Sequence, residues 1–177
     1  MLNQTKRKLI FSIGLIIFVL TSITSIGFAN EQIVSLLPQE FLILSGDSAA
    51  LKLHYNVLSG QKGTTGLTIR IHYNSRLLDS VKLEDLYGEG LLGQDYTAKD
   101  DVKDFDNDPL TDKFLCVGWV GMMGKWPRIV SPPLDLGNIV VKAKSGISNG
   151  ETSINVSASS TPAGYNLITQ RSLIFIQ

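Results

Sequence analysis

The chain has 177 residues, with 16 basic and 16 acidic side chains and a formal net charge of zero. This balance argues against a nucleic acid or an anionic membrane surface as the partner, because both are bound through an excess of lysine and arginine. Cys116 is the only cysteine, so an internal disulfide is impossible and the fold must be stabilised by burial or by a metal ion.

Residues 1–29 have the three parts of an export signal. Three basic residues stand at positions 6–8, and residues 9–20 are almost wholly apolar. Gly27 and Ala29 then place small side chains at the third and first positions before a cleavage site. We predict that a signal peptidase cleaves after Ala29.

Cleavage leaves residues 30–177 as one secreted domain, extracellular or on the surface of a bacterial cell. The alternative is an uncleaved anchor, because residues 9–29 carry no charge and are just long enough to span a bilayer. Contact with a membrane is expected only in that case. The mature domain keeps 13 basic and 16 acidic residues, a net charge of −3 (13 − 16).

The apolar residues of the mature chain recur with a period of two, which is typical of strands that bury one face. In the clearest case Leu67, Ile69 and Ile71 alternate with Thr68 and Arg70. No convincing amphipathic helix interrupts this pattern, although residues 80–87 could hold one helical turn. The nine predicted strands are residues 32–36, 41–44, 51–57, 67–73, 77–83, 114–120, 139–143, 152–158 and 172–176.

Glycine, proline and asparagine fill the connections between these segments, as they do in tight turns. Many short strands joined by such turns predict an all-β fold, namely an antiparallel β-sandwich of about nine strands behind the signal helix. No linker, charged tail or internal repeat divides residues 30–177, so we expect a single domain.

Residues 100–112, which we call the acidic loop, contain six aspartates in thirteen positions. Carboxylates at this density repel one another unless cations bind among them. The alternate spacing of Asp104, Asp106 and Asp108 is typical of oxygen-rich loops that surround a hard cation. We predict a Ca²⁺ site formed by these three residues and Asp112, with backbone carbonyls completing it. The alternative is a solvated acidic loop without metal.

This loop is not an EF-hand. If Asp104 is counted as the first position, Pro109 stands where an EF-hand has its glycine, and Leu115 stands where it has a bidentate glutamate. A calcium site here would therefore have a different loop geometry, with Asn107 and Pro109 favouring a tight turn.

The apolar run 114–120 after the loop is typical of a buried strand. Within it we expect Cys116 to be a small core residue rather than a catalytic thiol, and Trp119 to pack in the core. Trp126, in contrast, lies among glycine, proline and basic residues, where exposure and burial are equally compatible with the sequence.

Exposed planar rings that stack on sugars would make the protein a carbohydrate-binding module. We predict Trp126, Tyr87, Tyr96 and Arg128 as candidate ligand-binding residues for a polysaccharide or a protein. The alternative is that the aromatic residues close the end of the sandwich.

Several segments together carry a family resemblance. They are residues 51–56, 66–74, 136–143 and 150–156, with the aspartate run, Gly118-Trp119, residues 124–127 and residues 159–165 between and after them. Over residues 32–176 the chain resembles the cohesin-like domains of bacterial extracellular proteins. The resemblance implies the nine-stranded jelly-roll sandwich that these domains share with cellulosomal cohesins and some cellulose-binding modules. It also implies a dockerin-like protein partner held by a face of one sheet, although no short motif transfers those contacts to residues of this chain.

Nothing in the sequence indicates catalysis. The chain lacks the Gly-x-Ser-x-Gly pattern of a nucleophile turn, and His54 and His72 do not have the spacing of metal ligands. The acidic residues are clustered rather than separated into an acid and a base. We predict a non-enzymatic protein: a secreted binding module for polysaccharide or protein, or alternatively a structural protein that assembles at the cell surface or in the extracellular matrix.

Overall fold

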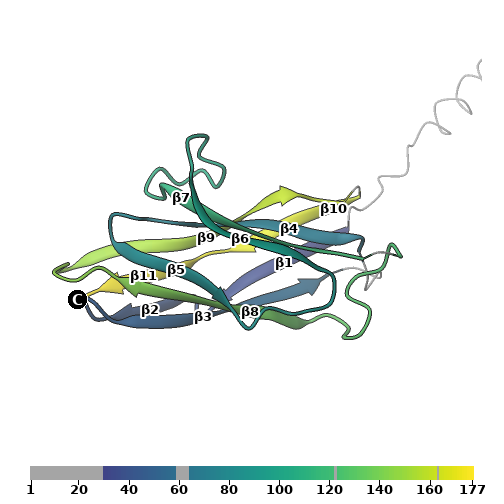
Figure 1. The fold of residues 1–177 in the computed structure, drawn as a ribbon, viewed down its shortest axis with the longest axis horizontal. Coiled ribbons are helices and arrows are strands. Elements are labelled where there is room, and N and C mark those ends of the chain that lie inside the picture. The colour runs from purple at the N-terminus through teal and green to yellow at the C-terminus, as the bar shows by residue number, and fades with distance from the viewer. Residues whose placement is uncertain (1–29, 59–63, 122, 163) are drawn as a thin grey trace, which may run out of the picture.

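The computed structural model describes residues 30–58, 64–121, 123–162 and 164–177, which form two β-sheets packed face to face (Figure 1). The predicted signal segment lies outside the described residues. Within them the chain forms strands only, so no helix there is long and apolar enough to span a bilayer. The strands are β1 (Asn30–Leu37), β2 (Glu40–Ile43), β3 (Ser48–Val57), β4 (Gly66–Tyr73), β5 (Leu78–Glu84), β6 (Leu91–Asp100), β7 (Lys113–Val120), β8 (Leu134–Ala143), β9 (Gly150–Ser160), β10 (Tyr165–Gln170) and β11 (Ser172–Ile176).

One sheet has five strands in the order β10-β1-β3-β8-β5, and the other has six in the order β2-β11-β9-β4-β7-β6. Neighbouring strands are antiparallel except in two pairs, β1 with β10 and β2 with β11. The expectation of a purely antiparallel sandwich is therefore wrong.

The parallel pairs arise because both ends of the domain change sheets together. Pro38, which lacks a backbone donor, separates β1 in one sheet from β2 in the other, and Arg171 separates β10 from β11 in the same way. As a result, β1 lies beside β10 in one sheet and β2 lies beside β11 in the other.

The core lies between the sheets, where the inward-facing residues of each strand alternate with outward-facing ones. On β4, Leu67, Ile69 and Ile71 are at most 1% exposed, as the period of two predicts. Leu51 and Leu53 on β3 meet them from the other sheet and are 0% exposed.

All nine predicted segments are strands, but the structure adds β6 and β10. β6 lacks a clear alternation because Gly93 and several polar residues interrupt it, and its pairing with β7 shifts register twice. β10 is short, polar and mostly exposed. The helical turn expected within residues 80–87 is wrong, since β5 extends to Glu84.

Candidate functional site

The acidic loop connects β6 to β7 and folds back over the outer face of the six-stranded sheet (Figure 1). Its two ends are held together, because the Asp101 N–H donates to the Asp112 carbonyl at 2.9 Å and Lys113 Nζ lies 2.6 Å from Asp100 Oδ1. The loop contacts residues of β4 and β9 that alternate with core residues. It therefore covers a part of the sheet that would otherwise face solvent.

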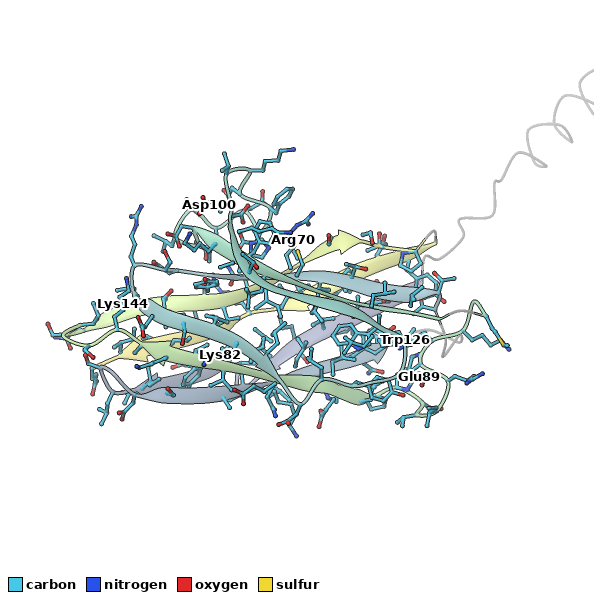
Figure 2. The ribbon with its side chains drawn as sticks, in the orientation of Figure 1. Arg70, Lys82, Glu89, Asp100, Trp126 and Lys144 are labelled. Carbon is cyan, nitrogen blue, oxygen red and sulfur yellow. The ribbon has the colours of Figure 1, made fainter. Side chains whose placement is uncertain are left out.

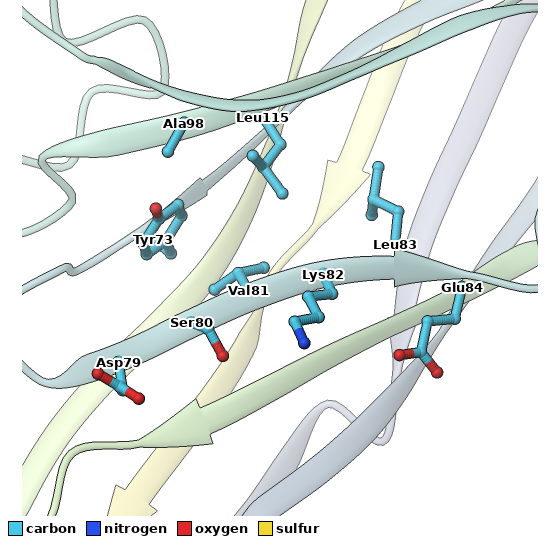
Figure 3. Close-up of a pocket in the computed structure, with 9 residues that line it drawn as sticks. All are labelled: Tyr73, Asp79, Ser80, Val81, Lys82, Leu83, Glu84, Ala98 and Leu115. Carbon is cyan, nitrogen blue, oxygen red and sulfur yellow. The ribbon is translucent and has the colours of Figure 1, made fainter.

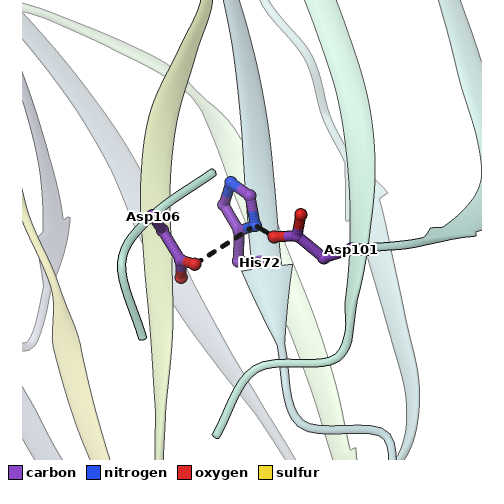
Figure 4. A group of neighbouring side chains, drawn as sticks. All are labelled: His72, Asp101 and Asp106. Carbon is purple, nitrogen blue, oxygen red and sulfur yellow. Dashed lines mark hydrogen bonds and ion pairs between the residues drawn. The ribbon is translucent and has the colours of Figure 1, made fainter. Parts of the chain in front are cut away.

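His72 of β4 points into the loop (Figure 4). Its Nδ1 lies 2.7 Å from Asp101 Oδ2 and 3.7 Å from Asp106 Oδ1, while its Nε2 lies 2.7 Å from Ser157 Oγ on β9. The side chains of His72 and Asp101 are 0% exposed and that of Asp106 is 3% exposed. Both ring nitrogens thus have partners, and the loop excludes solvent from the ring.

Asp106 and Asp108 converge on Asn155 of β9. The Asn155 Nδ2 group donates to Asp106 Oδ2 at 2.8 Å and to Asp108 Oδ2 at 2.9 Å. The Thr111 hydroxyl donates to Asp106 Oδ2 at 2.9 Å, and the Ser153 hydroxyl donates to Asp108 Oδ2 at 3.1 Å. Two of the four predicted metal ligands therefore lie next to each other, surrounded by neutral donors.

The environment of Asp108 favours its charged form. Burial alone would raise the pKa of this carboxyl, but hydrogen bonds from Asn155, the Leu110 N–H and Ser153, together with the positive charge of Arg171, lower the pKa below its usual value. Asp108 is therefore a carboxylate at neutral pH.

Asp104 and Asp112 are positioned differently from this pair. The Asp112 carboxylate accepts hydrogen bonds from the Ser75 N–H and hydroxyl, both at 2.6 Å, and so ties the end of the loop to the β4–β5 turn. Burial would raise the pKa of Asp112, but the Ser75 hydrogen bonds outweigh it and lower the pKa. Asp104 is exposed and has a left-handed backbone (φ 51°), which aspartate tolerates in tight turns.

The histidine, cysteine and acidic side chains of the described residues contain one group of three whose ligand atoms lie within 4.8 Å of one another: His72, Asp101 and Asp106. The 2.7 Å separation of His72 and Asp101 is a hydrogen-bond distance. Two ligands of a tetrahedral zinc ion at about 2.1 Å would lie about 3.4 Å apart. In this structure His72 and Asp101 are therefore spaced as a hydrogen-bonded pair and not as two ligands of one metal ion.

Aromatic and cation–π contacts hold the middle of the loop on the sheet. The Arg70 guanidinium lies 3.9 Å from the centre of the Phe105 ring and donates to the Ala158 carbonyl at 2.5 Å. Phe105 also packs edge-on against Phe114, with ring centres 5.9 Å apart. Figure 2 shows Arg70 beneath the loop. A partly desolvated cation–π contact contributes about 0.5–2 kcal/mol, so these contacts oppose detachment of the loop.

The bonds from Asp101 to His72 to Ser157 follow the order found in serine hydrolases. The surroundings do not suit that chemistry, because His72 is sealed beneath the loop and Ser157 lies within β9 rather than on a turn that projects it toward a substrate. A substrate would have to displace the loop to reach His72. We assign these bonds a structural role.

Trp126 is a core residue. It is 0% exposed, its ring stacks on Trp119 with centres 5.9 Å apart, and its indole N–H donates to the Glu89 carbonyl at 2.7 Å. The prediction of an exposed stacking ring is wrong for this residue. The physical reason is close backbone approach: a Cβ added at Gly90 or Gly121 would lie 3.1 or 3.0 Å from Trp126 atoms, so glycine allows the chain to close over the ring.

Tyr87 and Arg128 belong to the part of the chain that closes over the Trp126 ring, and Glu89 forms hydrogen bonds with both of them. The Glu89 carboxylate accepts from the Tyr87 hydroxyl at 2.6 Å, from the Arg128 N–H at 2.9 Å and from the Ile129 N–H at 2.8 Å. Burial and the bond to Glu89 raise the pKa of Tyr87 to about 12, and the same bond is the main cause of the lowered pKa of Glu89. Figure 2 shows Glu89 beside Trp126.

The other three predicted residues have different outcomes. Trp119 is 1% exposed, which confirms its predicted place in the core. Cys116 is half-buried on the outward side of β7, between the inward-facing Leu115 and Val117, so the expectation of a core position is wrong. The side chain of Tyr96 lies outside the described residues, and its ligand-binding role stays a prediction.

A hollow of about 480 Å³ lies at the open edge between β5 and β6 (Figure 3). Tyr73, Val81 and Leu115 form its apolar interior. Lys82 and Glu84 stand on β5 and point away from that interior in Figure 3. The hollow is a gap between the edges of the two sheets, and the charged side chains of Lys82 and Glu84 lie at the rim.

Sequence reasoning missed His72 and Asn155 as parts of the site. Both stand at outward positions of strands, where polar residues normally face water and carry no signal. What brings them under the acidic loop is the strand order β9-β4-β7, which local sequence does not specify.

No protein-family model matches the chain, and no curated protein matches it in sequence. Its fold is nevertheless similar to those of solved cohesin modules. The seventh ScaB type I cohesin from Pseudobacteroides cellulosolvens superimposes with a TM-score of 0.54 at 10% identity, over 82% of this chain and 92% of that one.

Two further cohesins are similar and were solved in complexes. The OlpA cohesin of Clostridium thermocellum, bound to the dockerin Doc918, has a TM-score of 0.51 at 14% identity over 84% of this chain and all (100%) of that one. The sixth cohesin of Acetivibrio cellulolyticus scaffoldin B, bound to a Cel5 dockerin, has a TM-score of 0.51 at 12% identity over 83% and 99% of the two chains. This likeness confirms the cohesin-like fold that the sequence resemblance implied.

Proposed function

We propose that this protein is an exported, non-catalytic module that binds a protein partner of the dockerin type through the outer face of its six-stranded sheet. The observation that carries the proposal is the fold, since two solved cohesins with this architecture are in complex with dockerins. The burial of His72 under the acidic loop supports a binding role rather than a catalytic one. The dockerin-type partner and the export from the cell are both parts of this proposal. The support for them is the likeness of fold.

Charged pairs stand on the outer face of the five-stranded sheet. The five-stranded sheet carries exposed ion pairs, Lys52 with Asp135 at 2.9 Å and Lys142 with Asp79 at 3.6 Å. The centres of protein interfaces are depleted in charged residues, because burying a charge without full compensation costs free energy. An uncharged area of the surface is therefore the better candidate for the centre of an interface.

The six-stranded sheet offers an uncharged patch at the start of β4 that the acidic loop does not cover. A hollow of about 290 Å³ is lined there by Thr68, Leu92 and residues with small or uncharged side chains: Thr65, Gly66, Ser160 and Pro162. Leu92 is 55% exposed, which gives a partner an apolar contact. An apolar centre with hydroxyl groups around it suits a protein partner.

Binding of purified dockerin modules to the protein, measured by calorimetry, tests the proposal. Leu92→Arg and Thr68→Arg place a charge in the patch and should weaken binding at least tenfold. Ala50→Arg is the matched control, because Ala50 is exposed on β3 of the other sheet and its substitution should leave the affinity unchanged. Binding that responds to Ala50→Arg but not to Leu92→Arg would reject the proposed face, and failure to bind any dockerin would reject the partner class.

Polysaccharide recognition has less support than a protein partner. Trp126 and Trp119, the two largest aromatic side chains, are 0% and 1% exposed and offer no stacking surface. A glycan array read with the same protein distinguishes the two ligand classes.

Assembly at the cell surface is the second candidate function. Leu42 and Leu44, on or next to the edge strand β2, are 53% and 56% exposed. An edge strand with exposed apolar residues is prone to pair with another chain. Oligomers in light scattering that disappear in Leu42→Lys, without dockerin binding, would favour this function.

A further inference from the structure

Negative charge beneath the acidic loop exceeds the positive charge that contacts it. Asp101 and Asp106 are almost completely buried, and both lie within 4 Å of His72. One imidazole can pair closely with one carboxylate, and Asp101 holds the shorter contact to His72. Asp106 is then left beside Asp108, another carboxylate, with neutral partners between them. Adjacent carboxylates in a buried place favour the binding of a cation.

A second observation comes from Asn155, which is only 7% exposed. Its Nδ2 donates to both carboxylates, while its Oδ1 is buried and has no hydrogen-bond partner. An unpaired buried carbonyl costs about 1–3 kcal/mol, so an acceptor left in this state is unusual. The side chain lines the same hollow of about 320 Å³ as Asp106 and Asp108.

A half-turn of the Asn155 carboxamide about its Cβ–Cγ bond exchanges the amide nitrogen and oxygen. The two groups are nearly equal in size, so the exchange requires little movement of the neighbours. It would place Oδ1 where Nδ2 now lies, within hydrogen-bonding distance of one oxygen each from Asp106 and Asp108. Three oxygen atoms would then converge with no amide hydrogen between them, an arrangement that a bound cation stabilises.

We propose that Asp106, Asp108 and Asn155 bind a hard divalent cation, with Ca²⁺ as the best match, and that Asn155 turns its amide oxygen toward the ion. Carboxylate and amide oxygens are the ligands that Ca²⁺ prefers, and its variable coordination accepts backbone carbonyls or water for the remaining positions. The cation would tie the acidic loop to β9. This site is separate from the uncharged patch proposed for the protein partner.

The proposed ligand set differs from the one that spacing predicts. Asp104 is exposed, and Asp112 is engaged by Ser75, so neither is needed. Asn155 replaces them from a strand that lies 47 residues beyond Asp108 in the chain.

Arg171 provides an internal test of the charge argument. It is exposed, lines the same hollow, and its positive charge acts on Asp108. A cation at Asp106 and Asp108 would be repelled by this guanidinium. Removing it by Arg171→Gln should therefore tighten Ca²⁺ binding several-fold.

The experiment is calorimetric titration of the chelator-treated protein with CaCl₂, together with thermal unfolding with and without Ca²⁺. We expect one binding event and a rise in Tm. Asp108→Asn should weaken binding at least tenfold and abolish the Tm shift. Asp104→Asn, which removes the same charge from an exposed position of the same loop, should bind Ca²⁺ like the wild type.

Asn155→Asp separates loss of a ligand from loss of folding. This variant keeps an oxygen at the site but loses the amide donor, so it should have a lower Tm without Ca²⁺ and a larger Ca²⁺-induced rise than the wild type. Asn155→Leu should lose both the binding and the rise.

Three results would overturn the proposal: no heat and no Tm change at millimolar Ca²⁺, a Tm shift that persists in Asp108→Asn, or a shift lost equally in Asp104→Asn. A response to ZnCl₂ that depends on His72 and has no CaCl₂ counterpart would also overturn it in favour of the histidine group.

Discussion

His72 Nδ1 and Asp101 Oδ2 lie 2.7 Å apart, and both side chains are fully excluded from solvent. The two residues are 29 positions apart in the chain, one on β4 and the other at the start of the acidic loop. This contact converts an outward-facing strand residue into a buried one and fixes the loop on the six-stranded sheet.

We expect His72→Ala to destabilise the domain by about 3–5 kcal/mol, because it leaves Asp101 buried without its partner. The double variant His72→Leu with Asp101→Leu should be less destabilised than His72→Ala, since it removes both members of the buried pair. Urea unfolding followed by circular dichroism measures both. A loss below about 1 kcal/mol for His72→Ala would show that the pair is not a structural anchor.

Phe105 should keep the loop in place through Arg70 and Phe114. Phe105→Ala removes both ring contacts, so residues 101–112 should exchange amide hydrogens faster while the core strands are unchanged. Val102→Ala is the control, because Val102 lies in the same loop and is 91% exposed. Equal exchange rates in Phe105→Ala and the wild type would contradict the anchoring role.

Trp126 should matter for stability and not for ligand binding. Trp126→Ala empties a site that is 0% exposed and removes the bond to the Glu89 carbonyl, so we expect a loss of about 3–5 kcal/mol. Trp126→Phe keeps most of the volume and should cost less. Urea unfolding measures the losses, and a fully stable Trp126→Ala variant would be incompatible with the buried ring.

Acidification should weaken the closure around Glu89. Its hydrogen bonds lower the pKa in the folded protein below the ordinary value of 4.5. The Glu89 carboxylate therefore contributes stability above pH 4.5, and this contribution is lost as the pH falls through the lowered folded pKa. Glu89→Gln removes the titration. The Tm difference between wild type and Glu89→Gln should be positive at pH 7 and shrink below pH 4.5, whereas a difference independent of pH would refute the assignment.

The alternation of apolar residues was sufficient to predict the sandwich. The β4 segment around Ile69 is the clearest case, because period two and burial on one face follow directly from strand geometry. β6 was missed because irregular pairing at a sheet edge leaves no such pattern.

The site was only partly predictable, since it depends on long-range pairing. The aspartate run indicated a cation loop, and Asp106 and Asp108 do lie together. Asn155 reaches them only because β9 neighbours β4 beneath the loop. The burial of Trp126 likewise depends on Glu89 and Gly90, more than 30 positions earlier, so the local sequence around the ring could not reveal it.

A crystal structure of the protein grown with CaCl₂, with data collected for the anomalous signal of calcium, tests the central claim most directly. We predict an anomalous peak about 2.3–2.6 Å from oxygen atoms of Asp106 and Asp108 and from Asn155 Oδ1. Absence of a peak there, with Asn155 Nδ2 still donating to both carboxylates at saturating Ca²⁺, would contradict it.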